Sequence, residues 1–162
     1  MPEAFPGGSD TAPARPPPWW ARWRSRRVVV HDESMEPTLR PRDRLLVDRS
    51  AYREHSPSVG DIVVLVDPDE PSRWLVKRVA GIGPGDFWQT RTGLTTAFTT
   101  SPNEAPPSDA VEKVTLPTRS VFVMGDAPSV ARDSRQFGPV RVESVVGRVY
   151  RCYAPPDRCR DL

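Results

Sequence analysis

The chain has 162 residues, of which 37% are hydrophobic and 27% charged, and its formal net charge is only +2. This length suits one compact domain with tails, and the composition is typical of soluble globular proteins rather than of proteins with several membrane spans. So small a net charge gives no reason to expect nucleic acid as a partner. Twenty prolines against ten glycines disfavour long helices, because proline breaks helix interiors.

Residues 1–27 are predicted to comprise a disordered Pro-rich leader and a Trp/Arg segment. The leader has no apolar period and is rich in Pro, Gly, Ala and Ser. Trp19, Trp20 and Trp23 follow among arginines, a combination that suits a membrane interface or a basic tag whose tryptophans pack on the domain. Because no run of roughly 18 to 20 apolar residues occurs, the prediction is peripheral membrane association, with a soluble cytoplasmic protein as the alternative.

Six short apolar runs predict strands, since each is rich in β-branched residues and is bounded by Pro, Gly or Asp. The runs are Val28–Val30, Arg44–Asp48, Asp61–Asp67, Trp74–Val79, Ser120–Met124 and Ser144–Tyr153. Residues 87–119 are polar and rich in Thr and Pro, which indicates an inserted excursion. The prediction is therefore one all-β domain of short, curved strands over residues 28–153, followed by a C-terminal tail over 154–162.

The two cysteines do not indicate a metal site. Six residues separate Cys152 from Cys159, and no further His or Cys nearby completes a zinc pattern. Neither a metal nor another cofactor is expected. A disulfide and two free thiols both remain open.

Ser34 is the candidate nucleophile. It lies in a turn, Ser34-Met35-Glu36-Pro37-Thr38-Leu39, directly after the first predicted strand. A serine on such a turn can present its hydroxyl together with backbone amides that bind an anion. Its hydroxyl needs a neighbouring base. Neither His31 nor His55 suits this role, because the glycine-flanked nucleophile elbow is absent and His31 would have to fold back within the same turn.

Lysine is the alternative base, and the chain has only Lys77 and Lys113. Lys113 lies in the polar excursion and should be solvated. Strand alternation places Lys77 on the same face as Leu75 and Val79, and this face should be buried. Burial disfavours the ammonium form, so the pKa of Lys77 should fall from about 10.4 towards that of a general base. The alternative is an edge-strand lysine whose amine reaches water.

Three ordered segments resemble the type I signal peptidase family of Ser/Lys proteases. They are Ser34 to Leu39, Lys77-Arg78-Val79 followed by Gly81 and Pro84-Gly85-Asp86, and Gly125-Asp126 followed by Asp133-Ser134-Arg135 and Gly138-Pro139-Val140. The resemblance covers residues 28–153. It implies a catalytic β fold that is shared with self-cleaving repressors, and a serine endopeptidase that cuts leader peptides or one dedicated precursor after small residues.

The resemblance also implies roles for individual residues. Ser34 would be the nucleophile, with its backbone amide in the oxyanion hole, and Lys77 the general base. Shallow apolar pockets are expected beside them. The residues that would support the pair are Met35, Asp133, Ser134 and Arg135.

Two of the departures from the family pattern bear directly on the proposed chemistry. Relatives often have Ser or Gly at the position of Asp32, and an ionised aspartate cannot donate a hydrogen bond to an oxyanion. Relatives commonly have, at the position of Ala131, a serine that hydrogen-bonds the lysine, so Ser134 would have to substitute. Two alternatives therefore stand beside the peptidase. One is a non-catalytic descendant that binds peptides by strand addition, and the other is a self-cleaving repressor-like protein.

Overall fold

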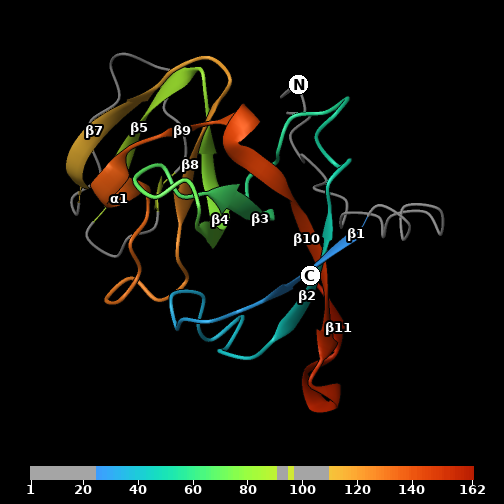
Figure 1. The fold of residues 1–162 in the computed structure, drawn as a ribbon. Helices are drawn as coiled ribbons and strands as arrows, with labels where there is room; N and C mark the ends of the chain where they lie inside the picture. Colours follow the sequence, from blue (N-terminus) through green and yellow to red (C-terminus); the bar gives the residue numbers. More distant parts are fainter. Residues whose placement is uncertain (1–24, 91–94, 97–109) are drawn as a thin grey trace, which may run out of the picture.

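The computed structural model describes residues 25–90, 95–96 and 110–162 of the chain, so the predicted leader and Trp19, Trp20 and Trp23 lie outside the described residues. The described part is built from two antiparallel sheets, the larger of which is strongly curled (Figure 1). Helical turns are few and short. The prediction of an all-β fold is confirmed.

The larger sheet has eight strands in the order β1-β2-β10-β3-β4-β8-β9, with β11 paired to β10. Their bounds are β1 (Ser25–Val29), β2 (Arg44–Asp48), β3 (Ile62–Val66), β4 (Trp74–Ile82), β8 (Ser120–Met124), β9 (Val140–Arg141), β10 (Val145–Ala154) and β11 (Arg160–Asp161). The smaller sheet has the order β6-β5-β7, from β5 (Gly85–Thr90), β6 (Thr95–Thr96) and β7 (Ala110–Leu116). The helical turns are α1 (Ser134–Phe137), η2 (Val142–Ser144) and η3 (Pro156–Arg158).

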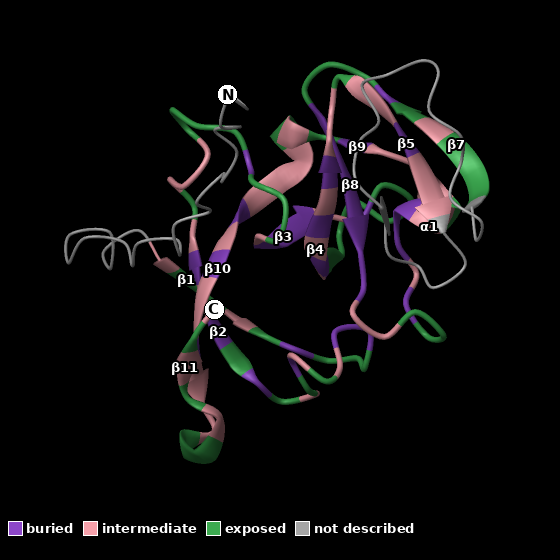
Figure 2. Ribbon diagram, turned by 180° about the vertical axis from the view of Figure 1, so that it is seen from behind, coloured by how far each residue is buried: buried purple, intermediate pink, exposed green. Residues whose placement is uncertain are grey.

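All six predicted strands are present, with their ends moved by a few residues. β10 joins the two halves of the larger sheet, because it pairs with β2 on one side and β3 on the other. Its register shifts at several points, which fits the bend of this long strand, since bulges increase local twist and bend a strand. Figure 2 shows the buried residues concentrated along β3, β4 and β8.

The predicted excursion contains the smaller sheet, which packs on the larger one. Phe87 of β5 meets Phe122 of β8 edge to face, with ring centroids 5.1 Å apart. Leu116 of β7 and Met124 of β8 complete this buried cluster. The apolar positions at the two ends of the excursion therefore join it to the domain.

Residues 154–162 also fold against the domain. Arg158 of η3 donates to both carboxylate oxygens of Asp43, at 2.7 and 2.8 Å, and Asp43 is buried. Arg158 also donates to the carbonyl oxygen of Thr38 at 3.3 Å. The C-terminal segment thus fixes the loop between β1 and β2. Cys152 is buried and Cys159 exposed, and both are free thiols.

Among the described residues, no helix has the length and apolar character that a bilayer crossing requires.

Candidate active site

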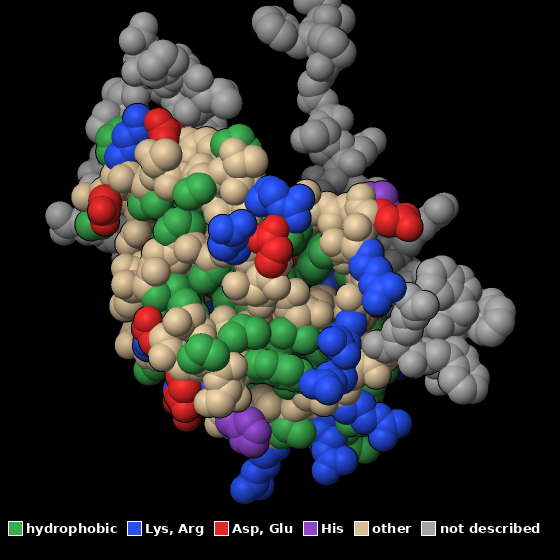
Figure 3. Space-filling model, turned by 45° about the horizontal axis from the view of Figure 1, so that its top comes forward, with side chains coloured by type: hydrophobic (Ala, Val, Ile, Leu, Met, Phe, Trp, Pro, Cys, Tyr) green, Lys and Arg blue, Asp and Glu red, His purple; other side chains and the backbone are tan. Residues whose placement is uncertain are grey.

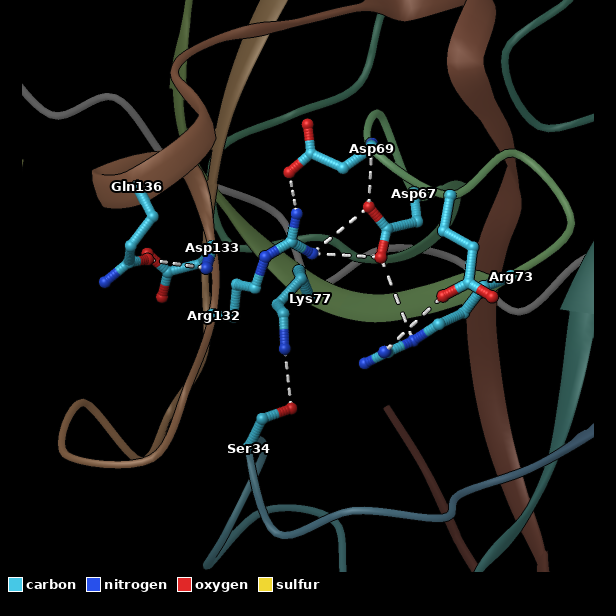
Figure 4. A network of polar contacts seen from close by, with 9 residues as sticks. Ser34, Asp67, Asp69, Arg73, Lys77, Arg132, Asp133 and Gln136 are labelled. Atoms are coloured by element: carbon cyan, nitrogen blue, oxygen red, sulfur yellow. Dashed lines mark hydrogen bonds and ion pairs between the residues drawn. The ribbon is translucent and has the colours of Figure 1, made fainter.

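The side chains of Ser34 and Lys77 meet inside the curled sheet. Lys77 Nζ donates a hydrogen bond to Ser34 Oγ over 2.6 Å, and both residues are buried (Figure 4). Ser34 comes from the loop between β1 and β2, whereas Lys77 comes from β4. Met35 and Leu39 hold the loop in place, because their side chains are packed in the core beside β2 and β10. Two segments far apart in sequence thereby place a hydroxyl and an amine in contact.

Strand alternation explains why Lys77 points inward. Along β4, Leu75, Lys77 and Val79 are each no more than 3% exposed, while the intervening Val76 and Arg78 are partly exposed. The predicted buried face is confirmed. A lysine on this face loses most of its hydration.

The surroundings of Lys77 lower its pKa. Burial is the largest cause, because it disfavours the ammonium form. The carboxylates of Asp32 and Asp133 oppose the change by stabilising the ammonium, while the cations of Arg73 and Arg135 add to it. The net direction increases the fraction of neutral amine, which is the form that can accept a proton.

Lys77→Met should give a more stable protein at neutral pH. The pKa of Lys77 is lowered on folding from the ordinary value of 10.5, so the unfolded chain binds more protons, and wild-type stability falls as the pH drops below this value. Methionine is uncharged at every pH, so its burial carries no such penalty. Urea unfolding between pH 6 and pH 10 should show a stability difference that narrows as the pH rises.

Lys113→Met is the matched control. Lys113 is half exposed and pairs with Asp86 at 2.9 Å, so its replacement should change the free energy of unfolding little. A Lys77→Met protein that is less stable than wild type at every pH would show that the buried amine stabilises the fold.

The backbone of Ser34 is held on both sides. Its amide donates to Asp32 Oδ1 at 3.0 Å, and its carbonyl oxygen accepts from the amide of Ala127 at 3.0 Å. The amide that was expected to donate to the oxyanion therefore donates to the carboxylate of Asp32. The contact with Ala127 joins the loop between β1 and β2, which carries Ser34, to the turn after β8.

Asp133 and Arg135 support this turn. The Gly125 amide donates to Asp133 Oδ2 at 2.9 Å, and Arg135 holds the same carboxylate through two hydrogen bonds of 2.8 and 2.7 Å. Asp133 also caps α1, since its side chain accepts from the amide of Arg135 and its own amide donates to Gln136. The pair is thus part of the loop that faces Ser34.

Ser134 is buried next to this pair. Its hydroxyl accepts a hydrogen bond from the amide of Val123 at 2.9 Å, which joins α1 to β8. This bond fixes the backbone of the supporting loop and is not a contact with Lys77.

A second ion pair, between Arg78 and Asp126, links all three motifs and was not predicted from the sequence. Arg78 donates to both carboxylate oxygens of Asp126, at 2.8 and 2.6 Å. The same guanidinium reaches the hydroxyl of Thr38 at 3.4 Å. Arg78, Asp126 and Thr38 each lie in a different motif segment. The joint occurrence of the three segments was the sequence feature that could have predicted this contact.

A pocket of about 420 Å³ opens over Ser34 and Lys77. The lining residues are His31, Asp32, Glu33, Ser34, Pro41, Arg73, Leu75, Lys77, Val130 and Arg132. Charged and polar side chains line this pocket together with Pro41, Leu75 and Val130, so part of its surface is apolar. The pocket has a charged wall, formed by Asp32, Glu33, Arg73 and Arg132, and these residues lie outside the three motifs.

Asp67 organises the arginines of this wall. Its carboxylate is 1% exposed and accepts two hydrogen bonds from Arg132, at 3.1 and 2.9 Å. Arg73 approaches the same carboxylate at 3.8 Å, and Arg132 also pairs with Asp69 (Figure 4). No motif marks this cluster, because 65 positions separate Arg132 from Asp67, although Asp69 and Arg73 are close to Asp67 in the sequence.

Among the described residues, no group of three or more His, Cys, Asp or Glu side chains is arranged to hold a metal ion.

Comparison with known proteins identifies the family. The family described as signal peptidase, peptidase S26, matches residues 23–154. The chain belongs to this family. The family membership and the peptidase class predicted from the motifs are thus confirmed.

Two curated relatives illustrate the range of the match. The chain is similar to the mitochondrial ATP-independent inner membrane protease subunit 1b of Arabidopsis thaliana, with 38% identity over 75% of this chain and 66% of that protein. It is also similar to the probable signal peptidase I-1 of a Synechocystis strain, with 29% identity over 82% of this chain and 73% of that protein. The chain therefore spans about two thirds to three quarters of the length of these relatives.

A signal peptidase I from Enterococcus faecalis V583 is similar in structure, with a TM-score of 0.42 and 21% identity. The match covers 57% of this chain and 95% of that one.

Proposed function

We propose that this chain is a serine endopeptidase of the signal peptidase type, with Ser34 as nucleophile and Lys77 as general base. The observation that carries the proposal is the 2.6 Å contact between Ser34 Oγ and Lys77 Nζ at the floor of an open pocket. When the amine is neutral, the direction of this hydrogen bond reverses and the hydroxyl donates to the lysine. The lowered pKa of Lys77, caused mainly by burial, increases the share of this reactive form.

The reaction then follows in two stages. Ser34 Oγ attacks the peptide carbonyl carbon while its proton passes to Lys77, and the carbonyl oxygen becomes an oxyanion. Collapse of this intermediate breaks the peptide bond, and Lys77 gives its proton to the leaving amine. The neutral lysine next takes a proton from the water that attacks the ester carbonyl, and gives this proton to Ser34 Oγ as the ester C–O bond breaks and the acid product leaves.

The proposed substrates are leader-bearing precursors or one dedicated precursor. Relatives carry names such as signal peptidase I and thylakoidal processing peptidase, and the family motifs imply cleavage after small side chains. Beside the apolar side chains of Pro41, Leu75 and Val130, the pocket also has a charged wall formed by Asp32, Glu33, Arg73 and Arg132. A narrow choice of precursor fits such a wall better than broad processing.

A synthetic leader peptide ending in Ala-Gln-Ala before the cut site tests the proposal. Wild-type protein should cleave it after the last alanine, as mass spectrometry of the products would show, and Ser34→Ala protein should not. Equal cleavage by both proteins would refute Ser34 as nucleophile. Binding of the peptide without cleavage by either protein would favour the non-catalytic peptide-binding alternative.

We propose further that the chain binds membrane surfaces peripherally. Arg26 and Arg27 of β1 are exposed and extend the basic Trp19, Trp20 and Trp23 segment into the described domain. On the face shown in Figure 3, Lys and Arg side chains gather along one side, next to a hydrophobic patch. Basic residues beside aromatic ones favour anionic membrane interfaces.

The full chain should therefore co-sediment with vesicles that contain 30 mol% phosphatidylglycerol, and much less with pure phosphatidylcholine vesicles. Replacing Trp19, Trp20 and Trp23 together with alanine should reduce the bound fraction several-fold. Trp88→Ala, in β5, is the matched control and should bind like wild type. Equal binding by all three proteins would contradict the proposed role of the Trp/Arg segment.

A further inference from the structure

Asp32 lies at the reactive centre although the proposed reaction gives it no part. Its Oδ1 accepts the hydrogen bond of the Ser34 amide at 3.0 Å, and its side chain lines the same pocket as Ser34 and Lys77. An oxyanion formed by attack of Ser34 would need this amide as a donor. In the resting protein a negatively charged oxygen already accepts from it.

The charge of Asp32 also acts on the base. Among the charged groups near Lys77, the Asp32 carboxylate does most to raise its pKa, followed by Asp133, while burial and the cations of Arg73 and Arg135 lower it. Asp32 therefore favours the ammonium form of Lys77, which cannot accept a proton. His31, Glu33 and Arg132 are the other titratable or charged groups that line the pocket.

The carboxylate of Asp32 is itself stabilised in its ionised form. Burial raises its pKa, but the hydrogen bonds with Ser34 and the cations of Lys77 and Arg73 outweigh burial, so the pKa lies below its ordinary value. At neutral pH the contact with the Ser34 amide is therefore one between a donor and a full negative charge.

We propose that Asp32 is an internal brake on the nucleophile, a positioning residue that occupies the Ser34 amide and must leave it when attack by Ser34 turns the substrate carbonyl oxygen into an oxyanion. The inference rests on the proposed function of Ser34 and Lys77. The carboxylate slows the reaction in two ways, because it occupies a hydrogen-bond donor that the oxyanion needs and because it favours the protonated form of Lys77. The resting enzyme is thereby held in a slow state.

Arg73 is placed to receive the released carboxylate. It lines the pocket beside Asp32, its side chain is half exposed, and its ion pairs with Asp67 and Glu70 are long, at 3.8 and 3.9 Å. Such pairs hold a side chain weakly. A small rotation of Asp32 towards Arg73 would free the Ser34 amide without leaving the carboxylate unpaired.

Two substitutions separate the charge of Asp32 from its hydrogen bond. Asp32→Asn keeps an acceptor oxygen for the Ser34 amide but removes the charge, whereas Asp32→Ala removes both. In NMR titrations that follow the side-chain Cε resonance, Lys77 should titrate at lower pH in both variants than in wild type. Lys113 is the only other lysine and serves as the internal control, because its titration should not move. No substrate is needed for this measurement.

Cleavage of the leader peptide reports on the hydrogen bond. At high pH, where Lys77 is neutral in every protein, Asp32→Ala should have a kcat roughly tenfold above wild type, since a hydrogen bond to a charged group no longer has to be broken. At high pH, the kcat of Asp32→Asn should exceed that of wild type by a smaller factor. Its cleavage rate should begin to rise at a lower pH than the rate of wild type. KM should change little in either variant.

Three results would overturn the inference. The first is a Lys77 titration that does not move in Asp32→Asn. The second is an Asp32→Ala protein that cleaves no faster than wild type at high pH. The third is a gain in rate that comes entirely from KM, since the released amide is needed only after attack begins. Failure of the proposed function would look different, because Ser34→Ala would then cleave like wild type while the NMR titrations kept their outcome.

Discussion

Ser34→Ala and Lys77→Met should each lower kcat for leader-peptide cleavage by at least about 10⁴-fold. The hydroxyl is a weak nucleophile without the amine that contacts it at 2.6 Å, and the amine has no reaction to assist without the hydroxyl. The double variant should therefore lose no more activity than either single variant. Single-turnover cleavage assays with excess enzyme would measure all four rates.

Lys77→Arg is a sharper variant for the same pair. Arginine keeps a positive charge at any accessible pH, so it cannot act as a base and should be as inactive as methionine. Lys113→Met should keep wild-type kcat. Losses that multiply in the double variant would show that Ser34 and Lys77 act independently, which would contradict the proposed mechanism.

The rate should also depend on pH in a defined direction. Only neutral Lys77 accepts a proton, so kcat/KM should rise with pH through the pKa of this lysine. Because burial lowers that pKa, the rise should occur below the ordinary lysine value of 10.5.

Local pattern was enough to predict the strands and the buried face of Lys77. The alternation of Leu75, Lys77 and Val79 follows directly from the period of a strand, and the three motif segments occur in a fixed order. The contact between Asp43 and Arg158 was beyond such reasoning, because 115 positions separate the two residues. No sequence feature near Arg158 indicates that the C-terminal segment contacts the loop between β1 and β2, which carries Ser34.

The chemistry of the pocket was harder to predict than its residues. Asp67 and Arg73 flank the turn between β3 and β4, whereas Arg132 reaches Asp67 only because the loop before α1 lies beside this turn. The contact of Asp32 with the Ser34 amide depends on the exact path of one turn, although the sequence already marked Asp32 as unusual. Residue types thus indicated where chemistry occurs, while backbone geometry determined which groups are free to take part.

Gly125→Ala should lower kcat by about 10²-fold while the fold is kept. A Cβ atom at this position would lie 2.5 Å from the carbonyl oxygen of Ser34 and would also clash with Cβ of Ala131. To relieve this clash, the turn after β8 and the loop that carries Ser34 must move apart. Because the amide of Ala127 donates to the Ser34 carbonyl oxygen, this movement displaces the backbone of Ser34. A displacement of about 1 Å is enough to misplace a reacting group and cause a loss of this size. Cleavage kinetics and circular dichroism would separate lost activity from lost structure.

Gly60→Ala provides the contrast for this variant. A Cβ atom on Gly60 would meet nothing within 4 Å, although its φ of +96° makes any side chain strained. This variant should lose about 1–2 kcal/mol of stability but keep its kcat. Adding Ala131→Gly to Gly125→Ala removes one of the two clashes and leaves the one with Ser34, so activity should stay low. Recovery of full activity in that double variant would show that Ala131, and not the backbone of Ser34, sets the requirement for glycine.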